Sequence, residues 1–266
     1  MKKPRLDEEL VTQGFFATSD EARRAVMAGE VSGESERFTS PGQRVKPGIF
    51  LHVKGRKQFV SRGGLKLQGG LDTFNLDPAG LRCLDIGCST GGFTDCLLGR
   101  GAAHVTAVDV GYAQFDWSLR NNPSVELHER TNIVDLATQD QVHTYDLAVC
   151  DVSFTSIENI LDAVIELLVP GGRFLTLVKP QFEASRDKVG KGGIVDDVKV
   201  RLEVLCDVAN LFAEKGFICQ GACVSPIHGA KGNVEYLLLG QLTNEPQDMC
   251  LDIEGVCIDE LPSRLV

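Results

Sequence analysis

The 266-residue chain carries a net charge of −10 at pH 7, and 43% of its residues are hydrophobic, as is ordinary for a globular protein. It has no run of ~18 apolar residues, and its start, MKKPRLDEEL, has no apolar core, so we expect neither a membrane span nor a signal peptide, and a cytoplasmic location. Nine cysteines without C-x-x-C spacing and five scattered histidines indicate reduced thiols and no metal site.

The charges are distributed unevenly along the chain. Residues 1–69 contain 13 Lys and Arg and 8 Asp and Glu, a net of +5, so residues 70–266 contain 14 and 29, a net of −15. Between Arg37 and Leu71 the chain has eight basic residues and no acidic one. The sequence therefore predicts a basic module joined to an acidic one, and the basic module suits a polyanionic partner despite the overall net charge.

The basic module is expected to begin with two short helices. Residues 5–14 carry apolar residues on one helical face, and Thr18 with Glu21 forms a capping box for a second helix, after which a strand-like IFLHV follows. This α+β order over residues 1–58 resembles the small RNA-binding domain first seen in ribosomal protein S-four. A solvated basic face without a ligand is the alternative. The side chains expected to hold RNA phosphates are Arg23, Arg24, Arg44, Lys46, Lys54 and Arg62.

The acidic module is predicted to be an α/β domain. Residues 59–68 have neither Ser/Gly repeats nor proline, so we expect an ordered interdomain linker, followed by a helix over residues 69–80. Apolar strands then alternate with helices, as in a doubly wound sheet. Strands are expected from residue 81 and over 104–110, 125–130, 145–152 and 172–179, and the clearest helices over 157–168 and 198–215.

The last two apolar runs, 217–225 and 234–242, are too close for a crossover helix, so we expect an antiparallel hairpin at the sheet edge. Seven strands ending in such a hairpin are typical of the Rossmann-like methyltransferase fold, here expected over residues 69–242. Residues 243–266 hold six acidic residues and one basic residue and are expected to form a peripheral acidic tail.

The segment LRCLDIGCSTGGF, residues 81–93, predicts a buried strand, a glycine-rich turn and the start of a helix, an arrangement that binds nucleotide-type ligands. Its G-x-x-x-G-G spacing differs from the G-x-G-x-x-G of NAD enzymes, and S-adenosylmethionine fits better. Asp109 is placed to accept hydrogen bonds from ribose hydroxyls, and Asn132 to contact the adenine edge or to cap a turn. An ordinary strand-turn-helix with a solvated Asp is the alternative. The residues expected at the cofactor are Asp85, Gly87, Ser89, Thr90, Gly91, Gly92, Phe93, Asp109, Asn132 and Asp151.

Charged residues at the strand ends are the candidate catalytic groups, because ligands of such folds collect at the carboxyl ends of the strands. Asp151 is followed by Val-Ser-Phe. This segment is neither the Pro-Pro-aromatic that amino-group methylases have at this point nor the Pro-Cys of carbon-five pyrimidine methylases, which favours an oxygen atom as the methyl acceptor. Lys179 ends an apolar strand, where burial and a neighbouring lysine would favour a neutral amine that can accept a proton. Lys66 and Glu235 are the other charged residues beside apolar runs.

The order Lys66, Asp151, Lys179, Glu235 resembles the K-D-K-E tetrad of the FtsJ-type ribose 2′-O-methyltransferases. Eight segments are similar to those of the TlyA family, often labelled haemolysin A: VSRGGLKL, DIGCSTGGFTDCLL, AVDVGY, ERTNI, DVSF, VKPQFEA, VGKGGIV and GNVEYLL. This resemblance covers about residues 5–242. It implies a two-domain enzyme that methylates a cytidine 2′-hydroxyl in large-subunit ribosomal RNA and, in longer members, also one in the small subunit.

The expected mechanism uses Lys179, assisted by Lys66 and Glu235, to deprotonate or orient the 2′-hydroxyl, while Asp151 orients Lys179 and the methionine end of the cofactor. The expected partner is ribosomal RNA or a ribosomal subunit, with no membrane and no metal, and the protein is expected to be a monomer. Two alternatives remain. One is a methyltransferase of a small molecule or protein, favoured by the net charge; the other is a membrane-active toxin, for which the sequence offers no apolar span and no basic amphipathic helix.

Overall fold

The computed structural model describes residues 3–13, 15–33, 36–46, 49, 51–55, 58–137, 143–229 and 231–243. The chain divides into two compact units, Met1–Ser61 and Arg62–Val266, and each has a hydrophobic core of its own. Apart from Thr243, the predicted acidic tail lies outside the described residues.

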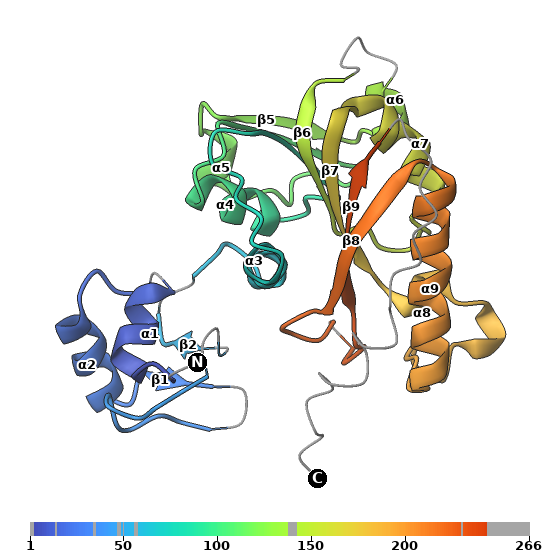
Figure 1. Ribbon diagram of the computed structural model, residues 1–266. Helices are drawn as coiled ribbons and strands as arrows, with labels where there is room; N and C mark the ends of the chain where they lie inside the picture. Colours follow the sequence, from blue (N-terminus) through green and yellow to red (C-terminus); the bar gives the residue numbers. More distant parts are fainter. Residues whose placement is uncertain are drawn as a thin grey trace. The chain divides into compact units, whose positions relative to one another are not determined.

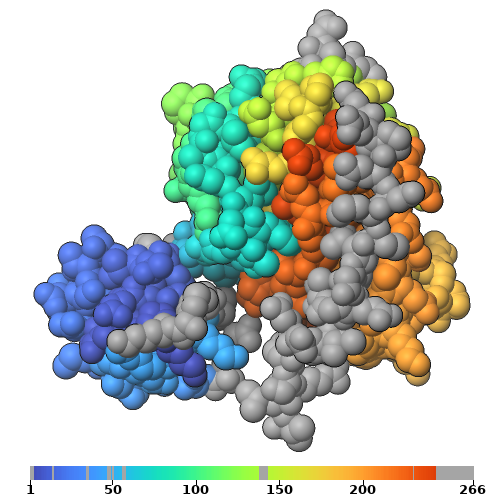
Figure 2. Space-filling view, viewed as in Figure 1, coloured from blue at the N-terminus to red at the C-terminus, as the bar shows by residue number. Residues whose placement is uncertain are grey.

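The N-terminal unit packs two helices against a small antiparallel sheet. Its elements are α1 (Leu6–Thr12), α2 (Ser19–Met27), β1 (Val31–Ser32) and β2 (His52–Val53). As predicted, Thr18 caps α2, because its hydroxyl accepts a hydrogen bond from the Glu21 amide at 3.3 Å. The described residues of this unit form one closely packed body, drawn in blue in Figure 2. Its core consists of Leu6, Leu10, Phe15, Phe16, Ala22, Val26, Val31, Phe38 and Val53.

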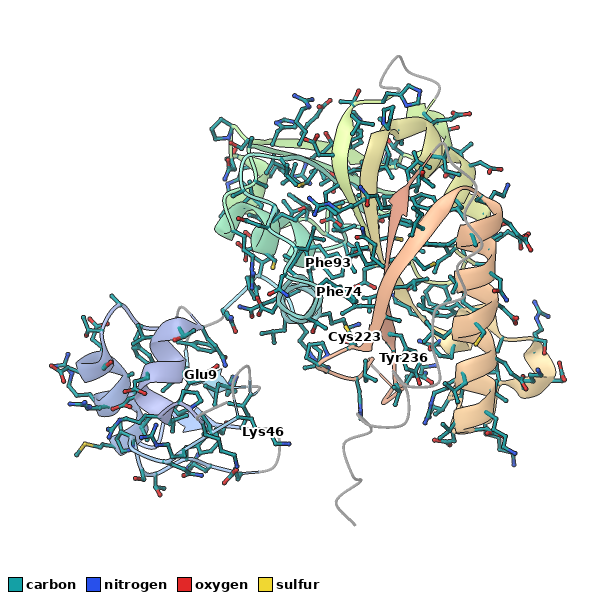
Figure 3. The ribbon with its side chains drawn as sticks, in the orientation of Figure 1. Glu9, Lys46, Phe74, Phe93, Cys223 and Tyr236 are labelled. Carbon is teal, nitrogen blue, oxygen red and sulfur yellow. The ribbon has the colours of Figure 1, made fainter. Side chains whose placement is uncertain are left out.

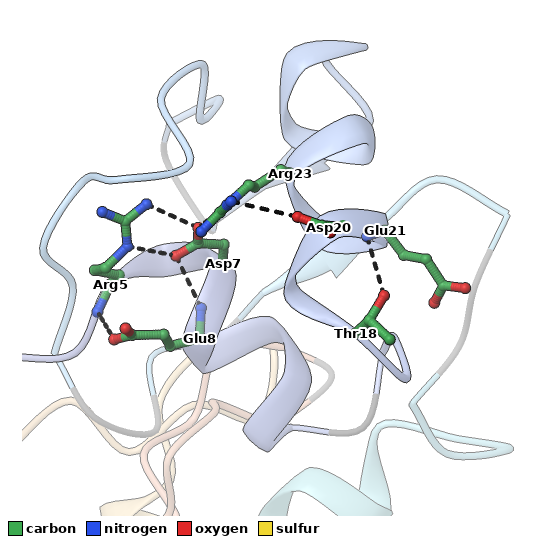
Figure 4. A network of polar contacts seen from close by, with 7 residues as sticks. All are labelled: Arg5, Asp7, Glu8, Thr18, Asp20, Glu21 and Arg23. Atoms are coloured by element: carbon green, nitrogen blue, oxygen red, sulfur yellow. Dashed lines mark hydrogen bonds and ion pairs between the residues drawn. The ribbon is translucent and has the colours of Figure 1, made fainter.

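A buried carboxylate joins the two helices of this unit (Figure 4). The side chain of Asp7 on α1 is fully buried and accepts hydrogen bonds from Arg5 at 2.8 and 2.9 Å and from Nε of Arg23 on α2 at 2.7 Å. Arg23 also reaches the exposed Asp20 at 3.3 Å. An arginine that the sequence assigned to RNA phosphate is therefore also part of an internal ion-pair network.

We expect Asp7→Asn to destabilise the N-terminal unit by roughly 1 to 2 kcal/mol at neutral pH. Hydrogen bonding to Arg5, together with Arg23, lowers the pKa of Asp7 to about 2. Because the unfolded carboxyl titrates near pH 4, this stabilisation is complete above about pH 4 and is lost as the pH falls toward 2. Hydrogen exchange of the α1 and α2 amides in the full chain, followed from about pH 6 to about pH 2, measures the difference between wild type and variant.

The matched control for this prediction is Asp20→Asn, which removes only the exposed partner of Arg23, a carboxylate that is 80% accessible. Such a surface pair contributes little, so exchange should stay close to that of the wild type. Equal effects of the two substitutions would contradict the role assigned to the buried Asp7.

The C-terminal unit is built on a seven-stranded sheet with strand order β5-β4-β3-β6-β7-β9-β8 (Figure 1). Neighbouring strands from β5 to β7 are parallel, whereas β9 pairs antiparallel with both β7 and β8. The predicted Rossmann-like sheet with a terminal antiparallel hairpin is confirmed. The strands are β3 (Arg82–Ile86), β4 (His104–Asp109), β5 (Val125–Glu129), β6 (Tyr145–Cys150), β7 (Leu168–Val178), β8 (Phe217–Val224) and β9 (Tyr236–Leu242).

Helices cover both faces of this sheet, which explains why its central strands are apolar along their whole length. On one face lie α3 (Gly63–Thr73), α4 (Gly92–Gly99) and α5 (Trp117–Arg120); on the other lie α6 (Ile133–Ala137), α7 (Glu158–Leu167) and α9 (Val198–Glu214) (Figure 1). The short helix α8 (Pro180–Glu183) and a 3₁₀ turn (Arg186–Lys188) connect β7 to α9. In the part of the chain that the structure describes, no helix is both long and apolar enough to cross a bilayer.

Strand β7 begins earlier than the sequence indicates. The sequence predicts a strand from residue 172, after a Pro-Gly-Gly break, but the strand starts at Leu168, which pairs with Tyr145 of β6. The next pair is Leu147 with Arg173, so the register shifts between them. The Pro-Gly-Gly segment is therefore contained in an irregular part of the strand, where a residue without an N–H and residues without a side chain are tolerated.

Helix α3 also lies elsewhere than expected, over Gly63–Thr73 instead of residues 69–80. Its glycines lie against other elements: a Cβ on Gly69 would come within 2.7 Å of Pro226, and one on Gly70 within 3.1 Å of Leu237 of β9. Phe74, which follows α3 and is labelled in Figure 3, packs in the same way against Gly221 of β8. Glycines that weaken a helix in isolation thus let α3 approach the β8–β9 hairpin closely.

Candidate active site

A pocket of about 560 Å³ opens at the carboxyl ends of β3, β4 and β6. This is the edge at which parallel α/β sheets bind ligands. Of the ten residues expected at a cofactor, five line the pocket: Gly87, Ser89, Asp109, Asn132 and Asp151. Apolar side chains, among them Ile86, Val108, Ile133 and Ile160, form much of the remaining wall.

The carboxylate of Asp109 ends β4 and is held in a fixed orientation by two backbone amides. One oxygen accepts a hydrogen bond from the amide of Ser89 at 2.7 Å, and the other from the amide of Gly111 at 2.6 Å. Each carboxylate oxygen has a second lone pair, so both can still accept hydrogen bonds from ligand hydroxyls. The side chain is thus preorganised at the pocket wall.

Asn132 caps a turn, one of the two uses that the sequence left open, and it also lies at the pocket wall. Its Oδ1 accepts a hydrogen bond from the amide of Val134 at 3.1 Å and so caps the first turn of α6. The residue also lines the pocket. Its amide nitrogen, the remaining donor of the side chain, is the group suited to an acceptor on a purine edge.

The glycines of the turn serve the packing of the protein itself. Gly87 has φ of 79°, and a Cβ there would lie 3.0 Å from the carbonyl oxygen of Asp151. Gly91 has φ of 94°, and a Cβ would lie 2.6 Å from Leu119 and 2.9 Å from Phe115. Glycine is therefore required at both positions by backbone conformation and protein contacts, whatever the ligand.

The other residues expected at the cofactor lie away from the pocket wall. Gly92 and Phe93 are buried in the first turn of α4 (Figure 3). The carbonyl of Thr90 accepts a hydrogen bond from the amide of Asp116 at 3.2 Å. These three positions therefore contribute to the packing of the turn and not to the pocket wall.

Asp85 is fully buried at the end of β3. Its Oδ2 accepts hydrogen bonds from the amide and the hydroxyl of Thr94, at 2.9 and 2.6 Å. Its Oδ1 is buried and has no hydrogen-bond partner among the described residues. Burial raises the pKa of Asp85 to about 7. A buried acceptor without a partner is costly, but Asp85 is not among the residues that line the pocket.

At one side of the pocket the sheet brings Lys179 and Asp151 into contact. Lys179 follows β7 directly, is 6% accessible, and places Nζ 2.5 Å from the carboxylate of Asp151, which follows β6. The same Nζ donates a hydrogen bond to the hydroxyl of Ser153 at 3.0 Å. Lys179 is thus fixed by two groups from the β6–α7 loop, both of which line the pocket.

Lys66 and Glu235 form a second buried pair, with Nζ of Lys66 on α3 2.5 Å from Oε2 of Glu235. Glu235 directly precedes β9, and the pairing of Val178 with Tyr236 sets it beside Lys179 at the strand ends. Gln181 links the groups, since its amide donates to Oε1 of Glu235 at 3.4 Å. The four residues of the predicted tetrad therefore lie as two adjoining lysine–carboxylate pairs.

The β6–α7 loop, which carries Asp151, contacts helix α8, which follows Lys179, through residues that the sequence did not single out individually. Glu183 accepts hydrogen bonds from the Ser156 hydroxyl at 2.7 Å and the Ile157 amide at 3.0 Å, and burial raises its pKa. Phe154 is 91% accessible with φ of 66°, and its ring lies 5.1 Å from that of Phe182. The segments DVSF and VKPQFEA contain three of these five positions, but only the fold shows that the two segments touch.

The six residues expected to bind RNA are distributed over both units. Arg24, Lys46 and Lys54 are exposed on the N-terminal unit, and Lys46 projects from its surface in Figure 3. Arg44, also exposed there, donates to the carbonyl of Lys3 at 2.8 Å. Arg62 is exposed on the C-terminal unit, where its guanidinium donates to the carbonyl of His228 at 3.0 Å.

The chain matches the sequence profile of the FtsJ-like methyltransferases over residues 59–242. Over 239 residues it is 46% identical to YqxC of Bacillus subtilis (strain 168), named as a candidate rRNA methyltransferase, and the match covers 89% of this chain and 85% of YqxC. It is 41% identical over 239 residues to TlyA of Mycobacterium tuberculosis (strain ATCC 25618 / H37Rv), named as a 16S/23S rRNA (cytidine-2′-O)-methyltransferase, with 89% of each chain covered.

A solved structure shows the same fold. A candidate hemolysin from Streptococcus thermophilus matches with a TM-score of 0.72 and 41% identity, covering 97% of this chain and 95% of that one. The match over more than half of the chain, the identity to the relatives and the shared fold agree. The chain therefore belongs to the FtsJ-like methyltransferase family, in the group that includes TlyA.

Proposed function

We propose that this S-adenosylmethionine-dependent methyltransferase modifies the ribose 2′-hydroxyl of a cytidine in the ribosomal RNA of the large subunit; the 16S/23S activity named for the Mycobacterium tuberculosis relative extends the proposal to the small subunit. The observation that carries the proposal is the pair of lysine–carboxylate contacts beside the pocket, Lys179 with Asp151 and Lys66 with Glu235. Amines and carboxylates at a strand edge suit proton transfer from an alcohol. The name of the Mycobacterium tuberculosis relative supports cytidine as the nucleotide.

The pocket residues fit S-adenosylmethionine. Asp109 would accept hydrogen bonds from its ribose hydroxyls, Asn132 would contact its adenine, and Asp151 lies where the methionine end would meet the catalytic lysine. When bound, the cofactor supplies a methyl group activated by a positively charged sulfur.

The protein's own part in the reaction is to position the hydroxyl and to move its proton. Nζ of Lys179 is held by Asp151 and Ser153, so it is positioned to orient the 2′-hydroxyl and to receive its proton without rearrangement. Lys66 and Glu235 shape the adjoining surface and hold the ribose. The exposed ring of Phe154 supplies a face on which a nucleobase can stack.

The same proposal extends to the organisation of the chain. Residues 1–58 act as the RNA-binding domain, 59–68 as the linker, whose second half forms the start of α3, 69–242 as the methyltransferase domain and 243–266 as an acidic tail. The exposed arginines and lysines of the N-terminal unit support the first assignment, and the family match over residues 59–242 supports the third. We further propose that the protein works as a monomer in the cytoplasm, where its ribosomal RNA substrate is found.

Mapping of ribose methylation by mass spectrometry tests the proposed function. Ribosomal RNA from cells that lack this protein should lose a 2′-O-methyl group on a cytidine, and the wild-type gene should restore it. A Lys179→Ala gene should not restore it, which assigns the modification to this active site. Identical methylation profiles with and without the protein would instead favour a non-RNA substrate.

A further inference from the structure

Two glycine-rich turns of the C-terminal unit each present an exposed lysine. In the first, Gly190 donates to the carbonyl of Ile194 at 2.9 Å, and Lys191 lies at its tip. In the second, Gly229 donates to the carbonyl of Asn233 at 2.9 Å, and Lys231 lies inside the turn. Among the described residues, neither lysine forms an ion pair. Neither charge is therefore used to hold the fold together.

A buried asparagine in the second turn forms hydrogen bonds that join it to the first turn. Asn233 is 3% accessible; its Oδ1 accepts a hydrogen bond from the amide of Val195 at 3.0 Å, and its Nδ2 donates to the carbonyl of Gly193 at 2.9 Å. A Cβ on Gly193 would lie only 3.7 Å from Nζ of Lys231. The lysine of one turn thus lies directly beside the backbone of the other.

The first turn is also anchored from helix α9. The buried Arg201 donates hydrogen bonds to the carbonyls of Val195 and Asp196, at 3.1 and 3.2 Å. Gly192 and Gly193 have φ of 82° and 78°, a conformation that other residues rarely adopt. The glycines and the buried polar groups therefore hold the backbone of an exposed segment in one defined shape, which fixes the position from which the Lys191 side chain extends.

The second turn packs against Glu235, one of the predicted catalytic residues. The backbone of Gly229 lies so close to the carboxylate of Glu235 that a Cβ would overlap it. Lys231 follows two residues later, so its backbone lies within about 8 Å of Gly229. Arg62 adds a third cation here, since its guanidinium donates to the carbonyl of His228 at 3.0 Å. Two cations, Arg62 and Lys231, are thus brought near Glu235.

These cations matter because residues 70–266 carry a net charge of −15, which repels a polyanion. We infer that the two turns, held together by Asn233, form a clamp in which Lys191 and Lys231 bind the phosphodiester backbone of the RNA next to the target ribose. The inference rests on the proposed function and deepens it. A phosphate bound by these lysines would hold the RNA strand beside the active site and so contribute to affinity for the RNA.

The clamp is tested by the salt dependence of RNA binding. The full-length double variant Lys191→Gln/Lys231→Gln should bind large-subunit ribosomal RNA, taken from cells that lack this protein, about 10-fold more weakly at moderate salt. The slope of log K against log salt should become shallower by roughly two, one unit for each lost phosphate contact. Lys191→Arg/Lys231→Arg keeps both charges and should retain the wild-type slope. Lys199→Gln, an exposed lysine on α9, is the matched control and should change neither quantity.

Kinetics separate the clamp from the chemistry. In the Gln double variant, KM for the RNA should rise while kcat at saturating RNA and the affinity for S-adenosylmethionine stay unchanged. The clamp would be overturned if the Gln double variant kept the wild-type salt slope, or if it lost no more RNA affinity than Lys199→Gln. Either result would leave the methyltransferase assignment intact. The salt slopes of the wild type and the Gln double variant could differ as expected while the wild type methylated no ribose. In that case the proposed function would fail and the clamp would stand.

Discussion

Lys179→Ala should lower the single-turnover rate of methylation by about 10²-fold or more, the usual scale for loss of a general base. The affinities for cofactor and RNA should change little. Nζ of Lys179 lies 2.5 Å from Asp151 and 3.0 Å from Ser153, so truncation removes the group itself and leaves the residues that line the pocket in place. Rapid-quench measurement with enzyme in excess isolates this step from product release.

Lys179→Arg distinguishes proton transfer from electrostatic positioning. A guanidinium keeps the positive charge near Asp151 but cannot accept a proton near neutral pH, so the variant should be as slow as Lys179→Ala if Lys179 is the base. Lys188→Ala, which removes an exposed lysine paired with Glu203, is the control and should leave the rate unchanged. Near-normal turnover of Lys179→Arg would mean that Lys179 only positions the hydroxyl and that the proton leaves by another route.

Breaking the buried pair of Lys66 and Glu235 should abolish most activity and also destabilise the fold. The two side chains are 11% and 3% accessible, so either Glu235→Gln or Lys66→Met leaves a charge that lacks its partner in a poorly hydrated site. Such single changes typically cost about 3 to 5 kcal/mol, whereas replacing both partners by apolar residues is often nearly neutral. Chemical denaturation followed by circular dichroism should show this difference.

The double variant Lys66→Met/Glu235→Leu separates the two roles of the pair. Its stability should return to within about 1 to 2 kcal/mol of the wild type, while its methylation rate should stay as low as that of the single variants. The exposed pair Lys188–Glu203, with side chains 45% and 56% accessible, is the matched control, and Lys188→Met should cost less than about 1 kcal/mol. Normal methylation by the double variant would show that the buried pair is purely structural.

The order of the strands along the chain and the residues that could carry chemistry were predictable from the amino-acid pattern. Apolar runs bounded by turn residues give the strands of an α/β sheet, and the short spacing of the last two runs requires an antiparallel hairpin, because no crossover helix fits between them. The residues Lys66, Asp151, Lys179 and Glu235 could be recognised because each is a charged residue beside an apolar run. This is a local pattern, and recognising it needs no knowledge of contacts.

Some local patterns were misleading, because propensity ignores what the rest of the chain supplies. The sequence predicts a helix over residues 69–80, but the helix spans Gly63–Thr73, since close packing against Pro226 and β9 compensates for the weak helix propensity of its glycines. Gly91 indicates a close approach to a ligand, yet Leu119 and Phe115 fill the space beside it. Arg23 has the exposed helical position of a phosphate contact, yet it pairs with the buried Asp7.

Which charged side chains contact one another depends on the three-dimensional fold. Lys66 and Glu235 are 169 positions apart, and they pair because α3 packs on the β8–β9 hairpin while β9 runs antiparallel to β7, which brings its first residue beside Lys179. The link between the two lysine turns through Asn233 likewise joins segments about 40 residues apart. A sequence pattern reports the neighbours of a residue along the chain, whereas ion pairing depends on distances of a few ångströms in space, and these are set by strand order, strand direction and helix packing.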